Sequence, residues 1–272
     1  MTDSKKRKAG PKSLGIILGS AFENEFASKL MLEPEVADTP WGRITLFSSG
    51  LSNDRPVYIL FRHGLPHSLL PNQINYRAQA AALQQVNCGA LLINSSVGVL
   101  DPDLPIYKPM LVTDLLMPEN RLPDGSTCTM YPEPKAHQGH LLIREGLFSQ
   151  SLNEQISARH PGSIFKPENG LVFVYAGGPR SKTAAENRMW AQLGGQVNSM
   201  TLAPEVVLAN ELEIPVSALV VGHKYSVPGR INPEVRKIAE TLVDAREATE
   251  SILLDFIEHG EPVVFANQIY RY

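Results

Sequence analysis

The stretch Ala90-Leu91-Leu92-Ile93-Asn94-Ser95-Ser96 decides how this chain folds. Its apolar residues are consecutive rather than alternating, which is typical of a short strand buried on both faces. Five further runs share this character: 14–19, 57–62, 110–113, 171–176 and 216–222. Because such strands need helices above and below them, the sequence predicts an α/β fold: one three-layer α/β/α domain with a twisted, mainly parallel or mixed central sheet.

Segments with helical periodicity lie between these runs. Asn72 is the expected N-cap of the first helix, and Gly89 is its expected stop. Asn232 and Pro233 are expected to begin the last helix. The expected helices are 72–88, 140–159, 182–193, 204–211 and 232–260.

No linker, low-complexity insert or repeat interrupts these strands and helices, so the sequence predicts a single domain over residues 13–272. Residues 1–12, which precede it, are expected to form a flexible basic tail.

The overall composition excludes several classes of protein. The 272 residues are 43% hydrophobic, which is enough to bury a sizeable core and excludes wholesale disorder. Lys and Arg total 25 against 28 Asp and Glu, a net charge of −3, so the overall charge favours neither a nucleic acid nor an anionic membrane as partner. No apolar run reaches the roughly 18 residues of a membrane-spanning helix.

The few cysteines and histidines indicate the cellular compartment and bear on metal binding. Cys88 and Cys128 are too few for a disulfide framework, so we expect reduced thiols and a cytoplasmic protein. His137 and His140 are closely spaced, but no carboxylate or thiolate cluster accompanies them, so we expect no metal site. The preceding segment, 118–138, is polar and rich in Pro and Gly, and is expected to be a long functional loop.

Polar side chains follow the ends of several expected strands. In an open α/β sheet the carboxyl ends of parallel strands meet at one edge, where ligands bind. An arginine fork, hydroxyls and small residues at such an edge suit an oxyanion such as phosphate. No glycine-rich dinucleotide motif or P-loop lysine motif follows the first strand, so a nucleotide-binding loop is not supported. The residues concerned are Ser20, Arg62, His63, Ser95, Ser96, Met200, Thr201, His223, Lys224 and Ser226.

Each of these features alone has a simpler structural interpretation. Gly19-Ser20 is compatible with a plain tight turn, and Ser95 and Ser96 with hydroxyls bonded to the backbone. Arg62 with His63 is compatible with a structural ion pair. Their convergence at one sheet edge is what favours a binding site.

Four motifs, in order along the chain, are more specific. They are Arg62-His63-Gly64 with His67, Pro71, Asn75-Tyr76 and Ala78; Asn94 to Leu100; Gly178-Pro179-Arg180 with Glu186; and Met200-Thr201-Leu202-Ala203-Pro204-Glu205-Val206-Val207-Leu208-Ala209. Together they resemble the motifs of the purine nucleoside phosphorylase and methylthioadenosine phosphorylase family, in its trimeric branch. The resemblance spans residues 14 to about 222 and implies a nucleoside phosphorylase-like fold.

The resemblance implies a reaction and roles for individual residues. Phosphate attacks the anomeric carbon of a nucleoside and releases the free base and a sugar 1-phosphate. Inorganic phosphate is then a co-substrate, with no cofactor and no metal, and the expected assembly is a homotrimer or a dimer of trimers. Met200 would pack on the ribose, His67 would lie near the sugar with a catalytic role, and His140 would reach the 5′ pocket of a neighbouring subunit. The phosphate ligands would be Ser20, Arg62, His63, Ser95, Ser96 and Thr201.

The base half of the expected site departs from the family. Where methylthioadenosine phosphorylases have an Asp-x-Asp pair that contacts the purine, this chain has Lys224 and Ser226. An ammonium only donates hydrogen bonds, so Lys224 in a catalytic, base-contacting role would suit a base with acceptors, such as a 6-oxopurine. The alternative is that Lys224 points to solvent or pairs with a carboxylate.

The residues around the expected base position are also unusual. Ser181 and Lys182 follow Gly178-Pro179-Arg180, where the family often has a stacking aromatic residue. With His223 they complete the expected nucleoside-binding set.

Three functions follow from these observations. The first is phosphorolysis of a purine nucleoside, whose base is a candidate 6-oxopurine or whose sugar is a candidate for a 5′-methylthio group. The second is a catalytically impaired member of the family that binds a nucleoside and phosphate without reaction. The third is phosphorolysis with another leaving group, such as a pyrimidine.

Overall fold

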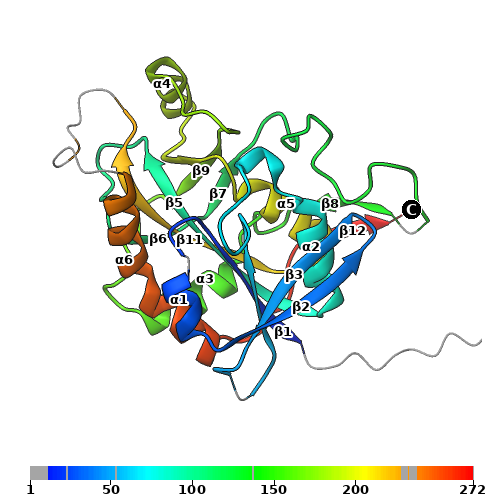
Figure 1. Ribbon diagram of the computed structural model, residues 1–272. Helices are drawn as coiled ribbons and strands as arrows, with labels where there is room; N and C mark the ends of the chain where they lie inside the picture. Colours follow the sequence, from blue (N-terminus) through cyan, green and yellow to red (C-terminus); the bar gives the residue numbers. More distant parts are fainter. Residues whose placement is uncertain are drawn as a thin grey trace, which may run out of the picture.

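The computed structural model describes residues 12–22, 24–52, 54–136, 138–227, 232 and 238–271. Within them the chain forms a ten-stranded sheet with the strand order β2-β3-β4-β1-β5-β10-β9-β7, and β11 pairs with β5 and β6 (Figure 1). The central strands run parallel to one another: β1 (Ser13–Leu18), β4 (Val57–Phe61), β5 (Cys88–Val99) and β11 (Val216–Tyr225). The α/β class with a mixed sheet is therefore confirmed.

The outer strands complete the sheet. The hairpin of β2 (Leu32–Thr39) and β3 (Gly42–Ser49) joins β4 in antiparallel orientation. This hairpin was not expected from the sequence, because half of its residues are exposed and its strands carry no long run of apolar side chains. The remaining strands are short: β6 (Pro109–Leu111), β7 (Asp114–Leu116), β9 (Val172–Tyr175) and β10 (Val197–Ser199).

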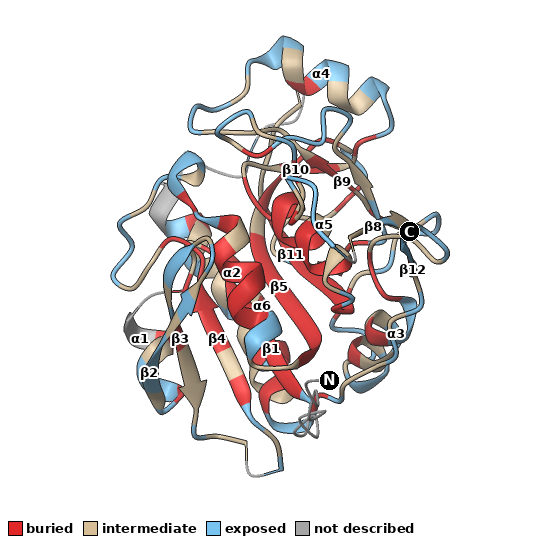
Figure 2. Ribbon diagram, turned by 90° about the vertical axis from the view of Figure 1, so that its right-hand side faces the viewer, coloured by how far each residue is buried: buried red, intermediate tan, exposed pale blue. Residues whose placement is uncertain are grey.

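Helices cover both faces of the sheet, which explains the consecutive apolar residues of its central strands (Figure 2). Leu91 and Ile93 of β5 pack into the core beside α2 (Tyr76–Gln85) and α5 (Ala203–Glu211). The alternate residues Ala90 and Leu92 pack into a second core. That core includes residues of α1 (Asn24–Lys29), α3 (Gln150–Arg159) and α6 (Ile238–His259). No described helix has the length and apolar composition needed to cross a membrane.

Both predicted boundaries of the helix expected over 72–88, α2, are wrong. It begins at Tyr76, because the side chain of Asn75, not Asn72, caps it by accepting a hydrogen bond from the Ala78 N–H. A short 3₁₀ turn, η1 (Pro71–Gln73), contains Asn72 instead. The same helix ends at Gln85, and Gly89, its expected stop, already belongs to β5.

The helix expected over 140–159 is present only as α3 (Gln150–Arg159). Its first part is instead the strand β8 (Gly139–Leu142), which pairs with β12 (Gln268–Arg271). A side chain at Gly139 would lie 2.4 Å from the carbonyl oxygen of Tyr270, so the close approach of the two strands requires glycine there. This long-range pairing overrides the local periodicity.

Some sequence predictions fall outside the described residues. These are the flexible character of residues 1–11, the environment of His137 and the role of Pro233 in the first turn of the last helix. Asn232 is described, and its side-chain amide bonds both the N–H and the carbonyl group of Tyr225. Between β7 and β8 the described residues form a long loop without a helix or a strand, as expected for 118–138.

Candidate functional site

A gap along one edge of β5 creates the site. β1 pairs with this strand only as far as Ile93, and β10 pairs with Gly98 and Val99 in the opposite direction. Residues 94–97 lie between these two pairings on that edge. Because β10 runs antiparallel to β5, its end at Ser199 leads the chain back beside Ser95, where the two hydroxyl oxygens lie 3.5 Å apart.

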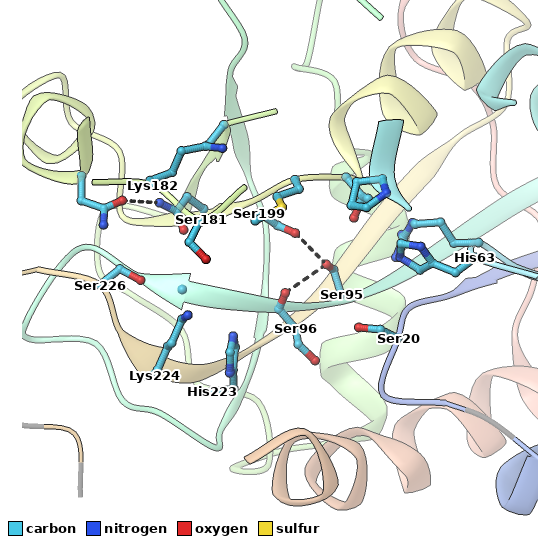
Figure 3. A pocket seen from close by; sticks show the side chains of 18 of the residues that line it. Ser20, His63, Ser95, Ser96, Ser181, Lys182, Ser199, His223, Lys224 and Ser226 are labelled. Carbon is cyan, nitrogen blue, oxygen red and sulfur yellow. Dashed lines mark hydrogen bonds between the residues drawn. The ribbon is translucent and has the colours of Figure 1, made fainter. Parts of the chain in front are cut away.

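The gap opens into a cavity of about 420 Å³ that brings together nearly all the residues selected from the sequence (Figure 3). Ser20, His63 and Ser95 lie at one end, and Ser181, Lys224 and Ser226 lie at the other. The predicted residues that line it are Ser20, Arg62, His63, His67, Ser95, Ser96, Ser181, Lys182, Met200, Thr201, His223, Lys224 and Ser226.

Arg62 is the most deeply buried charge in the cavity wall. Its side chain is 1% exposed, and its Nε donates a hydrogen bond to the equally buried carboxylate of Glu205 on α5. Its Nη1 donates to the carbonyl oxygen of Asn94 at 3.1 Å, but its Nη2 has no partner among the described residues. Arg62 can therefore form the structural ion pair and also bind a ligand, because its Nη2 remains available as a donor.

Hydroxyl groups surround this guanidinium end of the cavity. The Oγ of Ser95 lies 3.3 Å from the carbonyl oxygen of Ser96, so the expected bond of a strand-end hydroxyl to the backbone is present. Thr201 is 4% exposed and is followed by Leu202, whose φ of 76° lies in the left-handed region that favours glycine. This unusual backbone turn leads directly from Thr201 into α5, the helix that carries Glu205.

His63 is held as a neutral ring. Its Nδ1 donates to the carbonyl oxygen of Leu69 at 2.8 Å, and its ring stacks on that of His67 with centroids 4.5 Å apart. Burial, and then the charge of Arg62, lower the pKa of His63 to about 4. With Nδ1 protonated, the other ring nitrogen is an acceptor at neutral pH.

A β-bulge directs two consecutive residues of β11 into the other end. Gly222 pairs with Val97 and Lys224 with Gly98, so His223 is an extra residue in β11. An undistorted strand would turn His223 and Lys224 to opposite faces, whereas here both line the cavity. Burial, and then the charge of Lys224, lower the pKa of His223 to about 4.

Lys224 therefore lines the cavity (Figure 3). It forms no ion pair with a carboxylate in the described part of the chain. A Cβ atom at Gly98 would lie 2.3 Å from the Oγ of Ser226 and 2.7 Å from the Oδ1 of Asn198. The space around these polar groups therefore depends on a glycine at position 98.

The segment 177–186 has more of a structural role than its motif suggested. Arg180 does not line the cavity but forms a two-bond ion pair with Glu186, at 2.9 and 2.7 Å. Thr183 and Glu186 form a capping box at the start of α4 (Ala184–Gln192). Lys182 lines the cavity, yet its ammonium group donates to the carbonyl oxygens of Gly177 and Arg180.

Two asparagines in the cavity wall were missed from the sequence. The Nδ2 of Asn198 on β10 donates to the Oδ1 of Asn187 on α4 at 3.1 Å. Asn198 stands two residues before Met200, so the two-residue period of a strand was a signal that could have found it. Asn187 carries no such signal, because α4 is mostly exposed and its inward face is set by tertiary contacts.

His140 is the one selected residue that lies elsewhere. It belongs to β8, packs near the ring of Tyr270 with centroids 5.3 Å apart and lines a separate cavity of about 380 Å³. Within one chain it therefore does not join the other site residues.

Comparisons with known proteins agree with this geometry. Residues 13–258 match the model of the phosphorylase superfamily. The chain is 32% identical to a probable S-methyl-5'-thioinosine phosphorylase of Methanopyrus kandleri, over 78% of each protein. It is 29% identical to a 6-oxopurine nucleoside phosphorylase of Pyrococcus furiosus, over 77% of this chain and 78% of that protein.

Solved structures share the fold. A methylthioadenosine phosphorylase from Schistosoma mansoni in complex with adenine superposes with a TM-score of 0.75, at 21% identity and 91% coverage of both chains. Because the matched family model covers most of the chain, this protein belongs to the phosphorylase superfamily.

Proposed function

We propose that the chain is a purine nucleoside phosphorylase, a pentosyltransferase that uses inorganic phosphate to cleave the N-glycosidic bond. The observation that carries the proposal is Arg62, a buried guanidinium at the cavity wall whose Nη2 has no partner among the described residues. A phosphate oxygen would accept from this donor. The names of the relatives favour turnover over binding without reaction.

The residues at the Arg62 end would bind and orient phosphate. Arg62 and the neighbouring hydroxyls would donate to its oxygens, and neutral His63 would accept a hydrogen bond from a protonated oxygen. Holding the nucleophile in line with the anomeric carbon supplies much of the catalysis of such a displacement. The hydroxyl ligands proposed are Ser20, Ser95, Ser96 and Thr201.

The middle and far end of the cavity would hold the nucleoside. Met200 would pack on the ribose, and His67 would lie near the sugar. A bond forms between a phosphate oxygen and C1′ while the C1′–N bond breaks, and its electron pair goes to the base. Lys224 would donate a hydrogen bond to the departing base, which suits a 6-oxopurine. Ser181, Lys182, His223 and Ser226 would complete the nucleoside site.

The domain organisation, the co-substrate, the compartment and the assembly are also proposals. Residues 13–272 would form one domain after a basic tail, and phosphate would be the co-substrate with no cofactor. A cytoplasmic homotrimer or a dimer of trimers would fit the family resemblance, with His140 reaching a neighbour's 5′ pocket. Light scattering of the purified chain tests the assembly. If it is a trimer, His140→Ala should raise the KM of a 5′-methylthio nucleoside, whereas a monomer would overturn both ideas.

The central test is phosphate-dependent release of free base from a panel of 6-oxo, 6-amino and 5′-methylthio nucleosides. Base and sugar 1-phosphate should form in equal amounts, and omission of phosphate should abolish both. If no member of the panel turns over while thermal shift shows nucleoside binding, the protein binds without reaction and the proposal is wrong.

A further inference from the structure

The described residues that line the cavity carry positive charge and no carboxylate. Its permanent cations are Arg62, Lys182 and Lys224, and no Asp or Glu occurs among the described residues that line it. Glu205, the buried carboxylate next to Arg62, lies behind the wall and bonds the guanidinium from there. A ligand in this cavity therefore meets cations without meeting an opposing anion.

Two of these cations have partners. The charge of Arg62 is balanced by Glu205, and the ammonium group of Lys182 is bonded to the carbonyl oxygens of Gly177 and Arg180. Lys224 has neither kind of partner within the described ranges. It lies at the opposite end of the cavity from Ser20, Ser95 and His63 (Figure 3).

Three described groups that line this end of the cavity with Lys224 are neutral. The His223 ring is uncharged at neutral pH, since burial and then the charge of Lys224 lower its pKa to about 4. Asn198 is bonded to Asn187 and adds amide groups without charge. Ser226, whose Oγ would meet a Cβ at Gly98, adds a hydroxyl. Within the described residues, the far end thus presents the Lys224 ammonium without a counter-charge, beside neutral donors and acceptors.

We propose that this end of the cavity binds a nucleoside whose base is an anion at neutral pH, such as a 2,6-dioxopurine. In such a nucleoside the N3–H beside the C2 carbonyl ionises readily, because the negative charge spreads over the fused ring and the carbonyl oxygens. The Lys224 ammonium would pair with this charge, and the absence of a carboxylate in the described lining removes the repulsion that an acidic pair would create. This inference rests on the proposed phosphorylase function and deepens it.

The test compares three substrates that differ only at the 2-position of a 6-oxopurine. These are xanthosine, guanosine and inosine, and kcat/KM for phosphorolysis is measured at a mildly alkaline pH where xanthosine is an anion. We expect xanthosine to exceed both neutral substrates by about tenfold or more, as an ion pair in a partly exposed pocket allows.

Variants of Lys224 assign the preference to its charge. Lys224→Gln should lower kcat/KM for xanthosine by about tenfold and for inosine by less than about threefold, and Lys224→Arg should restore most of the xanthosine activity. Lys108→Gln, at an exposed lysine outside the cavity, is the matched control. Calorimetric binding of free xanthine and hypoxanthine gives a second readout that does not depend on turnover, and the preference for xanthine should vanish in Lys224→Gln.

The outcomes separate the two proposals. If kcat/KM for inosine or guanosine equals that for xanthosine, the anionic-base inference is wrong while phosphorolysis stands. The same holds if Lys224→Gln lowers kcat/KM equally for all three substrates. If no nucleoside of any kind releases base, the proposed phosphorylase function is wrong.

Discussion

The carboxylate of Glu205 and the guanidinium of Arg62 form an ion pair in which each side chain is 1% exposed. Arg62 directly follows β4, and Glu205 lies in the first turn of α5, so the pair joins a strand end to a helix start 143 residues later. A buried charge that loses its partner is strongly destabilising. Loss of either partner is therefore expected to destabilise the fold, and the bond to Nε is expected to fix the direction of the arginine fork.

Removal of the carboxylate should affect stability and phosphate use together. Glu205→Ala is expected to lower the free energy of unfolding by about 3–5 kcal/mol, because Arg62 would remain buried without a counter-charge. Glu205→Gln keeps an acceptor for the Arg62 Nε, so it should lose less stability while the KM of phosphate still rises. Urea denaturation and phosphate kinetics measure the two effects. An unchanged phosphate KM in the folded Gln variant would show that Glu205 does not orient the fork.

Arg62 itself should be irreplaceable by lysine. Arg62→Lys keeps the positive charge but loses the donors that bond Glu205 and Asn94 and the additional Nη2. We expect kcat/KM for phosphate to fall by about a hundredfold or more.

Arg180 provides the matched control for that substitution. It also belongs to a family-like motif, but it forms an exposed ion pair with Glu186 and does not line the cavity. Arg180→Lys should change kcat/KM for phosphate by less than about threefold, because exposed pairs contribute little. Equal losses in the two variants would mean that Arg62 has no special contact with phosphate.

The space at Gly98 should be essential for the nucleoside end of the cavity. Gly98→Ala would bring a Cβ within 2.3 Å of the Ser226 Oγ, so the KM of the nucleoside should rise by about tenfold, with a smaller change for phosphate. Ser226→Gly in the same chain removes the closest contact and should recover part of the loss, and a double-mutant cycle measures that coupling. Additive effects of the two substitutions would contradict the proposed overlap.

The run from Ala90 to Ser96 correctly predicted a strand covered on both faces, since each face packs into its own core. Local composition also located the strand-end residues Ser20, Arg62 and Lys224, because parallel topology brings such ends to one edge.

Features that depend on distant pairing could not be read locally. The bulge at His223 arises from the register between β11 and β5, and it decides that Lys224 faces the cavity. The strand β8 forms only because β12, more than 120 residues later, pairs with it. Glu205 stood within a quoted motif, but its partner Arg62 follows a strand far away in the sequence and meets it only in the folded chain.

The two neutral histidines should make stability depend on pH. His63 and His223 each have a pKa of about 4 in the folded chain, below the value of about 6.5 expected when unfolded. Between these values the unfolded chain binds more protons, so stability should fall as the pH drops from about 6.5 to about 4. Each histidine contributes at most about 1.4 kcal/mol per pH unit in this window.

Asparagine substitutions test whether these two histidines, and not other groups that titrate in acid, cause the pH dependence of stability. Asn at position 63 offers an amide N–H in place of the Nδ1–H that bonds Leu69, so His63→Asn with His223→Asn should retain the fold. Urea denaturation across the pH window should give a flatter slope for this double variant than for the natural chain. Identical slopes in the double variant and in the natural chain would mean that neither buried histidine resists protonation.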